Sequence, residues 1–457
     1  MNLLQAFILI VNMWRPAFCK LEAFYRAREH AVAALCSFGH HTITSIAIFL
    51  GRDRKKPSAD YKLYSWCKWK VEKIFNPLLG LCLHFFEEDY IIIGADDTKL
   101  KKTGKKIAFA SWQRDPMSPP FHVNFIWALR FLQFSVLMPL YKRTGVPCRA
   151  VPIRFIEAHA PKRPGKKASE EQKKDYRELQ KKYNLSCLFV KEVRNIREAI
   201  DREGGQDKKL LMVCDGSFCN QTCMGMNIDR VYLTARCRKD AKLCRPFQGE
   251  GRKIYDDKKF TPEEVRQDDS IVWHKKAFFY GGEWREIRYK EVNKILWSSG
   301  AKRRLLRLVV IAPLPYVRRG KRNYRQPAYL LSTDIEGSIE LLLQAYLDRV
   351  QIEYNHREEK SILGIGEAQV RNERSVSQQP ALCVAAYSAL LLASILAYED
   401  KPHPDFGEEP LWRPQPKHNS CRALIGLLRI SLLEHPEKII ELGIPPPIIT
   451  AILRKAA

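Results

Sequence analysis

YIIIGADDT, residues 90–98, is a continuous apolar run that passes directly into two acids and a threonine. A run without polar alternation predicts a strand that is buried on both faces of a sheet. A second stretch, KKLLMVCDGSF at 208–218, has the same form. We expect the first strand to end at Asp96 or Asp97 and the second at Asp215. Acids at the carboxyl ends of neighbouring strands converge at one edge of a sheet, so the two stretches predict a pair of carboxylates there.

Further segments give the order of elements around these two strands. Residues 105–113 alternate in polarity and residues 132–140 are apolar, which predicts two more strands. Residues 169–184 and 195–204 have the charge pattern of exposed helices, and residues 230–238 form a fifth predicted strand. Three strands in a meander, a helical stretch, and then strand, turn and strand follow the element order of an RNase H-like core. The predicted fold class is therefore α/β, with such a core interrupted by a β-rich insertion.

Changes in composition along the chain divide it into five predicted parts. Gly-Gly and Pro punctuate the strand-like segments of the insertion, whereas the N-terminal region reads as short helices compatible with a helix-turn-helix DNA reader. The parts are a helical, DNA-binding region at 1–80, the first part of the core at 85–238, the insertion at 239–326, the rest of the core at 327–400, and a linker with a helical C-terminal tail at 401–457.

The charge of the chain favours a polyanionic partner. Lys and Arg number 77 against 51 Asp and Glu, which gives a net charge of +26 over 457 residues. Such an excess attracts nucleic acid through counterion release and long-range steering. The basic residues are spread along the whole chain and form no single cluster beside an apolar segment, so nucleic acid is favoured over a membrane surface.

No segment reads as a targeting signal or as a membrane span. The apolar start lacks a preceding cation and a small-residue cleavage site, and the apolar run at 125–140 is too short to span a bilayer, so we expect it to be a buried strand pair. The 13 cysteines are odd in number and irregularly spaced, as is typical of reduced thiols in a cytosol. The tightest group, at 214, 219 and 223, lacks the ligand spacing of zinc sites, so we expect buried or unreactive thiols.

A charged helix near residues 345–364, AYLDRVQIEYNHREEKSILG, carries one polar line of unusual narrowness. At about 100° per residue, its members lie within a sector of roughly 60°. They are Tyr346, Arg349, Glu353 and Lys360. Glu358 and Glu359 point away from this line, and we expect them to be ordinary solvated residues.

Three carboxylates, from Asp96 or Asp97, from Asp215 and from Glu353, suit phosphodiester hydrolysis. Mg²⁺ prefers a few carboxylate oxygens together with phosphate oxygens of the substrate. Two such ions activate the attacking water and stabilise the leaving oxygen. Each acid alone is weak evidence, because an Asp after a strand usually serves a turn and Glu353 lies on a helix of mixed charge. The interpretation depends on the three acids together.

The spacing Y-x(2)-R-x(3)-E-x(6)-K, filled from Tyr346 to Lys360, resembles the signature around the third catalytic acid of bacterial insertion-sequence transposases of the DDE superfamily. GADDTKLKKTGKK at 94–106 resembles that family's first-acid segment, and VCDGSFCNQTCM at 213–224 with LTARCRKDAKL resembles the second. YLLSTD and the SILGIGEAQVRN extension are also similar. The resemblance extends from roughly Trp14 to Tyr398.

This resemblance implies that Asp96, Asp215 and Glu353 are the catalytic, metal-binding triad, with Asp97 open as an alternative first acid. It implies that Tyr346, Arg349 and Lys360 bind phosphates of the transposon end. The separation of 138 positions between the second and third acids matches relatives with a β insertion, whose aromatics can stack on a flipped base. Candidates for that role, which are also ordinary packing residues, are Trp273, Trp284 and Trp297.

The predicted function is cut-and-paste DNA transposition in the bacterial cytoplasm, at the nucleoid when DNA is bound. The implied cofactors are two Mg²⁺ ions per site, with Mn²⁺ as a substitute. The implied partners are double-stranded DNA, as terminal inverted repeats and as target, and a second copy of the chain in a homodimer. Three alternatives stay open: an RNase H-like nuclease without strand transfer, a former transposase retained as a DNA-binding protein, and a basic nucleic-acid packaging protein.

Overall fold

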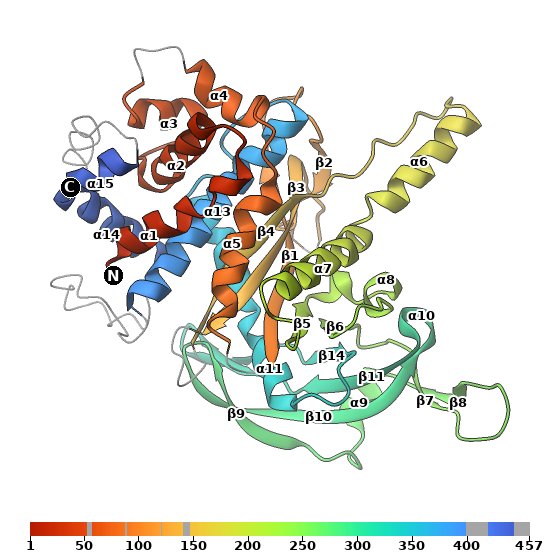
Figure 1. The fold of residues 1–457 in the computed structure, drawn as a ribbon. Coiled ribbons are helices and arrows are strands. Elements are labelled where there is room, and N and C mark those ends of the chain that lie inside the picture. The colour runs from red at the N-terminus through yellow and green to blue at the C-terminus, as the bar shows by residue number, and fades with distance from the viewer. Residues whose placement is uncertain (53–56, 87–88, 120, 140–146, 399–418, 443–457) are drawn as a thin grey trace. The chain divides into compact units, whose positions relative to one another are not determined.

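The chain forms two compact units in a computed structural model that describes residues 1–52, 57–86, 89–119, 121–139, 147–398 and 419–442 (Figure 1). The first unit comprises Met1–Phe85, Asp97–Tyr176 and Ile352–Ala457, and the second comprises Phe86–Asp96 and Arg177–Gln351. About 42% of the residues are helical and 27% lie in strands, which confirms the α/β class. The predicted linker and residues 443–457 of the predicted tail lie outside the described residues.

Helices make up most of the first unit, and they pack around one long apolar helix. That helix, α13 (Glu373–Tyr398), is buried along nearly its whole length. It packs against α1 (Leu3–Asn12), α2 (Leu21–Cys36), α4 (Ser58–Ser65) and α5 (Val71–Leu83). The unit also contains α3 (Ile43–Phe49), α14 (Cys421–Glu434) and α15 (Pro436–Glu441). The helical character expected for 1–80 is therefore present.

Helix α13 is long and apolar enough, by length and composition, to span a membrane, and it is the one such helix among the described residues. Of its most apolar 18-residue window, 78% is buried inside the protein. The buried residues of α13 pack against the N-terminal helices and against strand β4 (Cys148–Glu157).

A small antiparallel group of strands completes the first unit. Strand β3 (Phe125–Pro139) pairs with β2 (Ser111–Arg114) through residues 125–128 and with β4 through residues 131–139. The prediction of a strand pair within 125–140 is wrong, because residues 125–139 form a single strand. The strand expected at 105–113 is shorter than predicted, since residues 105–110 are turns and loop.

The second unit is built on a mixed sheet. Its parallel part runs from the first half of β1 (Tyr90–Lys101) to β5 (Lys209–Cys214) and β6 (Val231–Arg236). Antiparallel pairing then continues through β14 (Ala328–Ser332), β11 (Lys302–Ile311) and β10 (Glu283–Trp297) to β9 (His274–Tyr280). The strands predicted as an insertion thus extend the sheet of β5 and β6. Figure 1 shows β9 and β10 as long curved strands.

Smaller elements complete the outer part of this sheet. β7 (Leu243–Pro246) pairs with β10 and with β8 (Tyr255–Phe260), and β12 (Pro315–Arg318) pairs only with β13 (Lys321–Tyr324) among the described strands. The short helices of this unit are α8 (Gln221–Met224), α9 (Pro262–Gln267) and α10 (Ser298–Ala301). Helix α7 (Leu185–Arg202) starts ten residues before the helix expected at 195–204. Helix α6 (Glu170–Lys182) matches the exposed helix expected there and has no buried residue.

Residues 345–364 do not form the single predicted helix. Helix α11 (Ile339–Asp348) begins earlier, where the Ser338 side chain accepts a hydrogen bond from the Leu341 N–H and caps the helix. Helix α12 (Val350–Ser361) follows after Arg349, whose φ and ψ of −52° and −28° remain helical. Tyr346 therefore belongs to α11, Glu353 and Lys360 belong to α12, and Arg349 is the one residue between the two helices.

Candidate active site

Asp96 and Asp215 follow paired residues of two neighbouring parallel strands. Ala95 of β1 lies opposite Cys214 of β5 in the register, and each acid is the next residue in its strand direction. The structure therefore places the two acids side by side at the point where β5 ends, as the apolar runs predicted.

Side-chain alternation places both acids on one face of the sheet. A hydrophobic cluster marks that face, and it contains Leu211, Val213 and Ala345, with Tyr90, Ile92 and Tyr346 packed against it. Because successive side chains in a strand point to opposite faces, Asp96 shares the face of Ile92, and Asp215 shares the face of Val213. Asp97 points to the opposite face, where it accepts a hydrogen bond of 2.7 Å from Arg130 Nε. Helix α11, which carries Ala345 and Tyr346, packs over the face of Asp96.

The prediction that the first strand ends at Asp96 or Asp97 is wrong. Strand β1 continues to Lys101, although its pairing with β5 stops at Ala95. The acids are tolerated within a strand because each has a nearby guanidinium group, Arg349 for Asp96 and Arg130 for Asp97. The two acids therefore lie where β5 ends, and β1 continues beyond this point.

Arg349 brings a positive charge to the pair of acids. Its Nη1 lies 3.6 Å from Asp96 Oδ2, with 16% of the Arg349 side chain and 19% of the Asp96 side chain exposed. Burial raises the pKa of the adjacent Cys214 thiol well above its ordinary value, with further raising by the Asp215 and Asp96 charges and an opposing effect of Arg349. Both acids and Arg349 thus lie within electrostatic range of one buried atom.

Asp215 also has a local structural role. Its side chain caps the short 3-10 helix Gly216–Phe218, accepting hydrogen bonds from Ser217 N at 2.9 Å and from Ser217 Oγ at 3.2 Å. This is the turn role that is usual for an Asp after a strand. The carboxylate is only half-buried, so it remains accessible to solvent while it caps the turn.

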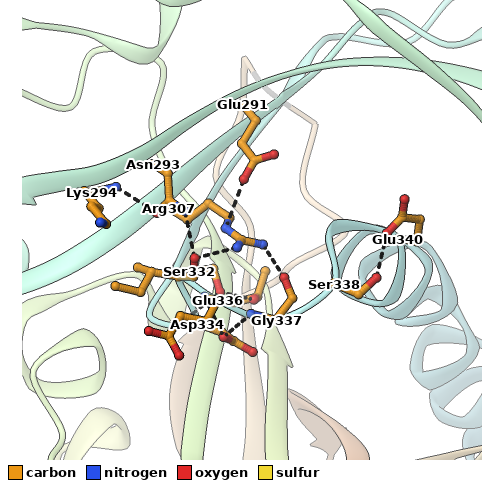
Figure 2. A network of polar contacts seen from close by, with 12 residues as sticks. Glu291, Asn293, Lys294, Arg307, Ser332, Asp334, Glu336, Gly337, Ser338 and Glu340 are labelled. Atoms are coloured by element: carbon orange, nitrogen blue, oxygen red, sulfur yellow. Dashed lines mark hydrogen bonds and ion pairs between the residues drawn. The ribbon is translucent and has the colours of Figure 1, made fainter.

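A network of buried polar contacts fixes the start of helix α11. Arg307 donates hydrogen bonds to the carbonyl oxygens of Ile335 at 2.6 Å and Gly337 at 2.8 Å (Figure 2). Asp334 accepts from the Gly337 N–H at 2.8 Å and from the Tyr90 hydroxyl at 2.7 Å. Tyr90 is the first residue of β1, so the loop before α11 is tied to the strand that carries Asp96. The sequence indicated this loop only through the YLLSTD resemblance.

Glu353 and Lys360 lie on α12 in the first unit, whereas Asp96, Asp215, Tyr346 and Arg349 belong to the second unit. Both side chains are exposed. They are seven residues apart, which is two turns, and therefore share one face of α12. Lys360 also lines a cavity of about 410 Å³ in this unit together with Lys99, Lys101 and Glu367. Lys99 and Lys101 stand in the GADDTKLKK segment, but the sequence analysis did not predict a role for either cation.

Glu358 and Glu359 are buried, so the expectation that they are solvated is wrong. Glu358 forms an ion pair with Arg149 of β4 and accepts a hydrogen bond from the Tyr387 hydroxyl of α13. Arg149 also donates to the Tyr387 oxygen at 3.1 Å. The partners of Glu358 come from β4 and α13, far away in the sequence, whereas Glu359 lies 3.4 Å from His356 Nδ1 on its own helix.

The cysteines and the three candidate tryptophans were also singled out in the sequence. All thirteen cysteines lie in the described residues and are free thiols. Burial raises the pKa of Cys219 to about 12 and that of Cys223 to about 11, which disfavours reactive thiolates. Among the three tryptophans, Trp273 lies beneath Arg288 and Lys290, Trp284 is exposed, and Trp297 lines a cavity of about 550 Å³ with Gly216, Arg236 and Arg238.

The donor atoms of Asp96 and Asp215 suit a magnesium ion, because carboxylate oxygens are its preferred protein ligands. Within the described ranges, however, no group of three or more His, Cys, Asp or Glu side chains is arranged to hold a metal ion. The two aspartates make a carboxylate pair next to Arg349.

Comparison with protein-family models and with curated proteins finds no match for this sequence.

Proposed function

We propose that the chain is a DNA transposase of the DDE type, with an RNase H-like core formed by β1, β5, β6 and their partner strands. The observation that carries the proposal is the pairing of Asp96 with Asp215 on one sheet face, under the helix that leads into Arg349. Glu353 follows Arg349 by four residues and supplies the third carboxylate. The net charge of +26 supports a DNA partner.

Asp96, Asp215 and Glu353 would hold Mg²⁺ ions, with Mn²⁺ as a substitute. When bound, such ions activate water as the attacking group and stabilise charge on the leaving oxygen. Carboxylates hold these ions without forming a covalent bond to DNA. The first cut leaves a 3′-hydroxyl, which then attacks a phosphodiester of target DNA in a transesterification at the same residues.

The cations and the tyrosine of the signature orient the DNA backbone. Arg349 presents a planar fork of donors that suits two phosphate oxygens, and it already lies beside Asp96. Lys360 adds a point charge from the exposed face of α12, and the Tyr346 hydroxyl adds one donor. In this proposal Arg349 compensates Asp96 before DNA binds and moves to a phosphate afterwards. The N-terminal helices and basic surfaces bind the terminal repeats, and two ends are paired in a homodimer.

The test is strand cleavage and joining with Mg²⁺, using the full-length protein and DNA that carries the repeats flanking its gene. We expect Glu353→Ala to abolish both reactions while retaining DNA binding. The matched control is Asp240→Asn, which removes an exposed acid of the second unit. Unchanged joining in Glu353→Ala would refute the assignment. Cleavage by the wild type without any joined product would instead support the RNase H-like nuclease.

One observation favours a second candidate, a DNA-binding protein that has lost the reaction. The described residues contain no three-residue group arranged for a metal, as a protein without cleavage activity would allow. This candidate predicts DNA binding by the wild type with no cleavage in Mg²⁺ or Mn²⁺, and unchanged binding in Asp215→Ala. Metal-dependent cleavage that is lost in Asp215→Ala excludes it.

A further inference from the structure

The β12–β13 hairpin of the second unit is a separate two-stranded ribbon. Pro315 pairs with Tyr324 at its base and Arg318 pairs with Lys321 at its tip. Two residues, Arg319 and Gly320, make the turn. The ribbon is connected to β9 through Arg325, whose guanidinium lies 5.6 Å from the centre of the Tyr280 ring.

The hairpin concentrates positive charge that the protein does not neutralise. No Asp or Glu occurs between residues 312 and 333. The exposed cations in this segment are Arg318, Arg319, Lys321, Arg322 and Arg325. The structure gives none of the five an ion pair with a described residue. By contrast, the β7–β8 hairpin in the same unit mixes cations with Asp256 and Asp257, and its Lys253 pairs with Asp257 at 2.5 Å.

The cations occupy both faces of the ribbon. Residues that pair directly across an antiparallel ribbon point to the same face, and successive residues alternate. Arg318 and Lys321 therefore lie on one face, and Arg322 lies on the other with Val317. Aromatic rings support the guanidinium groups, since Arg322 lies 5.5 Å from the centre of the Tyr324 ring. A flat acidic surface would meet only one face of such a ribbon, whereas the groove of a duplex has phosphates on both walls.

The turn contains backbone strain at a charged residue. Arg319 has a φ of +51° and Gly320 a φ of +73°. A two-residue turn with both φ values positive is usually formed by Asn-Gly or Gly-Gly, because other side chains disfavour this conformation. Here an arginine occupies the strained position at the exposed tip. Such strain at a surface site indicates a use for the side chain, since glycine would fold more easily there.

We propose that the β12–β13 hairpin is an arm that enters the groove of double-stranded DNA, with the cations of its two faces contacting the phosphates of the two strands. The major groove is about 12 Å wide and admits a two-stranded ribbon. The arm deepens the proposed function by adding a duplex contact on the second unit, and it rests on that function only for the identity of the DNA. Binding through the arm requires neither Asp215 nor Glu353.

The test is the salt dependence of binding of the full-length protein to a duplex of fixed length, measured by fluorescence anisotropy. The variant Arg318→Gln/Arg322→Gln removes one cation from each face. The matched control, Lys258→Gln/Lys259→Gln, removes the same charge from exposed positions of β8. Each lost phosphate contact lowers the slope of log K against log salt by about 0.9, so we expect the arm variant to lose about 1.8 and the control to lose none. Equal slopes for the two variants would overturn the proposal.

Two further measurements separate a DNA contact from a structural role. We expect Arg319→Gly to weaken duplex binding several-fold with an unchanged or higher midpoint of thermal unfolding, since glycine relieves the strained φ. An Arg319→Gly protein with unchanged affinity would count against the arm. We also expect the arm variant to lose more affinity for the duplex than for a single strand of the same sequence, and an equal loss would contradict groove entry. If the wild type does not cleave DNA but the arm variant loses duplex affinity, the arm stands and the proposed reaction fails.

Discussion

Carboxylates lie beside an arginine in two regions of this protein, and their environments differ. Asp96 and Asp215 lie beside Arg349, and Glu358 lies beside Arg149. In the second unit, Asp96 and Asp215 are half-buried and Arg349 lies 3.6 Å from Asp96. In the first unit, Glu358 is buried against Arg149 and the Tyr387 hydroxyl, so its charge is compensated by contacts within the core. A half-buried pair that solvent reaches can accept a new ligand. A buried and fully surrounded ion pair can only stabilise the fold.

Asp215→Asn should produce the largest functional effect. The amide keeps the oxygen that caps Ser217, so the turn should persist, but it removes the negative charge needed to hold a metal ion. Losing several kcal/mol of transition-state stabilisation corresponds to a fall of roughly 10³-fold in strand cleavage. Single-turnover cleavage assays with Mg²⁺ measure this fall in rate, and Asp240→Asn is the control. Cleavage within about tenfold of the wild type would exclude Asp215 as a metal ligand.

Arg149→Met should cause the largest loss of folding stability among these variants. It leaves Glu358 buried without its cation, which typically costs about 3–5 kcal/mol of unfolding free energy. Urea denaturation followed by circular dichroism measures this loss. The double variant Arg149→Met/Glu358→Leu removes both charges and should recover much of the stability. A double variant less stable than Arg149→Met would mean that the carboxylate has other stabilising partners.

Lys102 is a buried cation that is held by backbone oxygens. Its Nζ donates to the carbonyl oxygens of Gly366 and Ala368, both at 2.8 Å, and burial lowers its pKa to about 8. Between about pH 8 and pH 10.5 the unfolded chain binds a proton that the folded protein lacks. Stability relative to Lys102→Met should therefore rise across this window, by about 3 kcal/mol in total. Below pH 8 both states are protonated and the difference should be flat.

The control for this pH dependence is Lys101→Met, which removes an exposed neighbouring lysine. Urea midpoints measured from pH 7 to pH 10.5 give the comparison. A difference between wild type and Lys102→Met that does not change with pH would show that the folded protein holds Lys102 with an ordinary pKa.

The sequence predicted the parts of the site that depend on local pattern. The apolar runs before Asp96 and Asp215 identified β1 and β5, because a buried strand needs an uninterrupted apolar run. Strand β4 was missed because Arg149 and Arg154 interrupt its apolar pattern, and both are buried. No local rule predicts this burial, since the partner of Arg149 is Glu358, 209 residues away. The same distance explains why Glu358 was expected in solvent.

The smallest predicted effect concerns which of two adjacent acids serves the site. Asp97→Asn removes the negative charge from the 2.7 Å contact with Arg130, and a partly exposed ion pair of this kind contributes up to about 1 kcal/mol to stability. Because Asp97 points to the face opposite Asp215, cleavage should fall only a few-fold, whereas Asp96→Asn should match the loss in Asp215→Asn. Parallel cleavage assays of the two variants measure this. A larger loss in Asp97→Asn would mean that Asp97 is the first acid in place of Asp96. The register of β1 against β5 would then have to shift by one residue when DNA and metal bind.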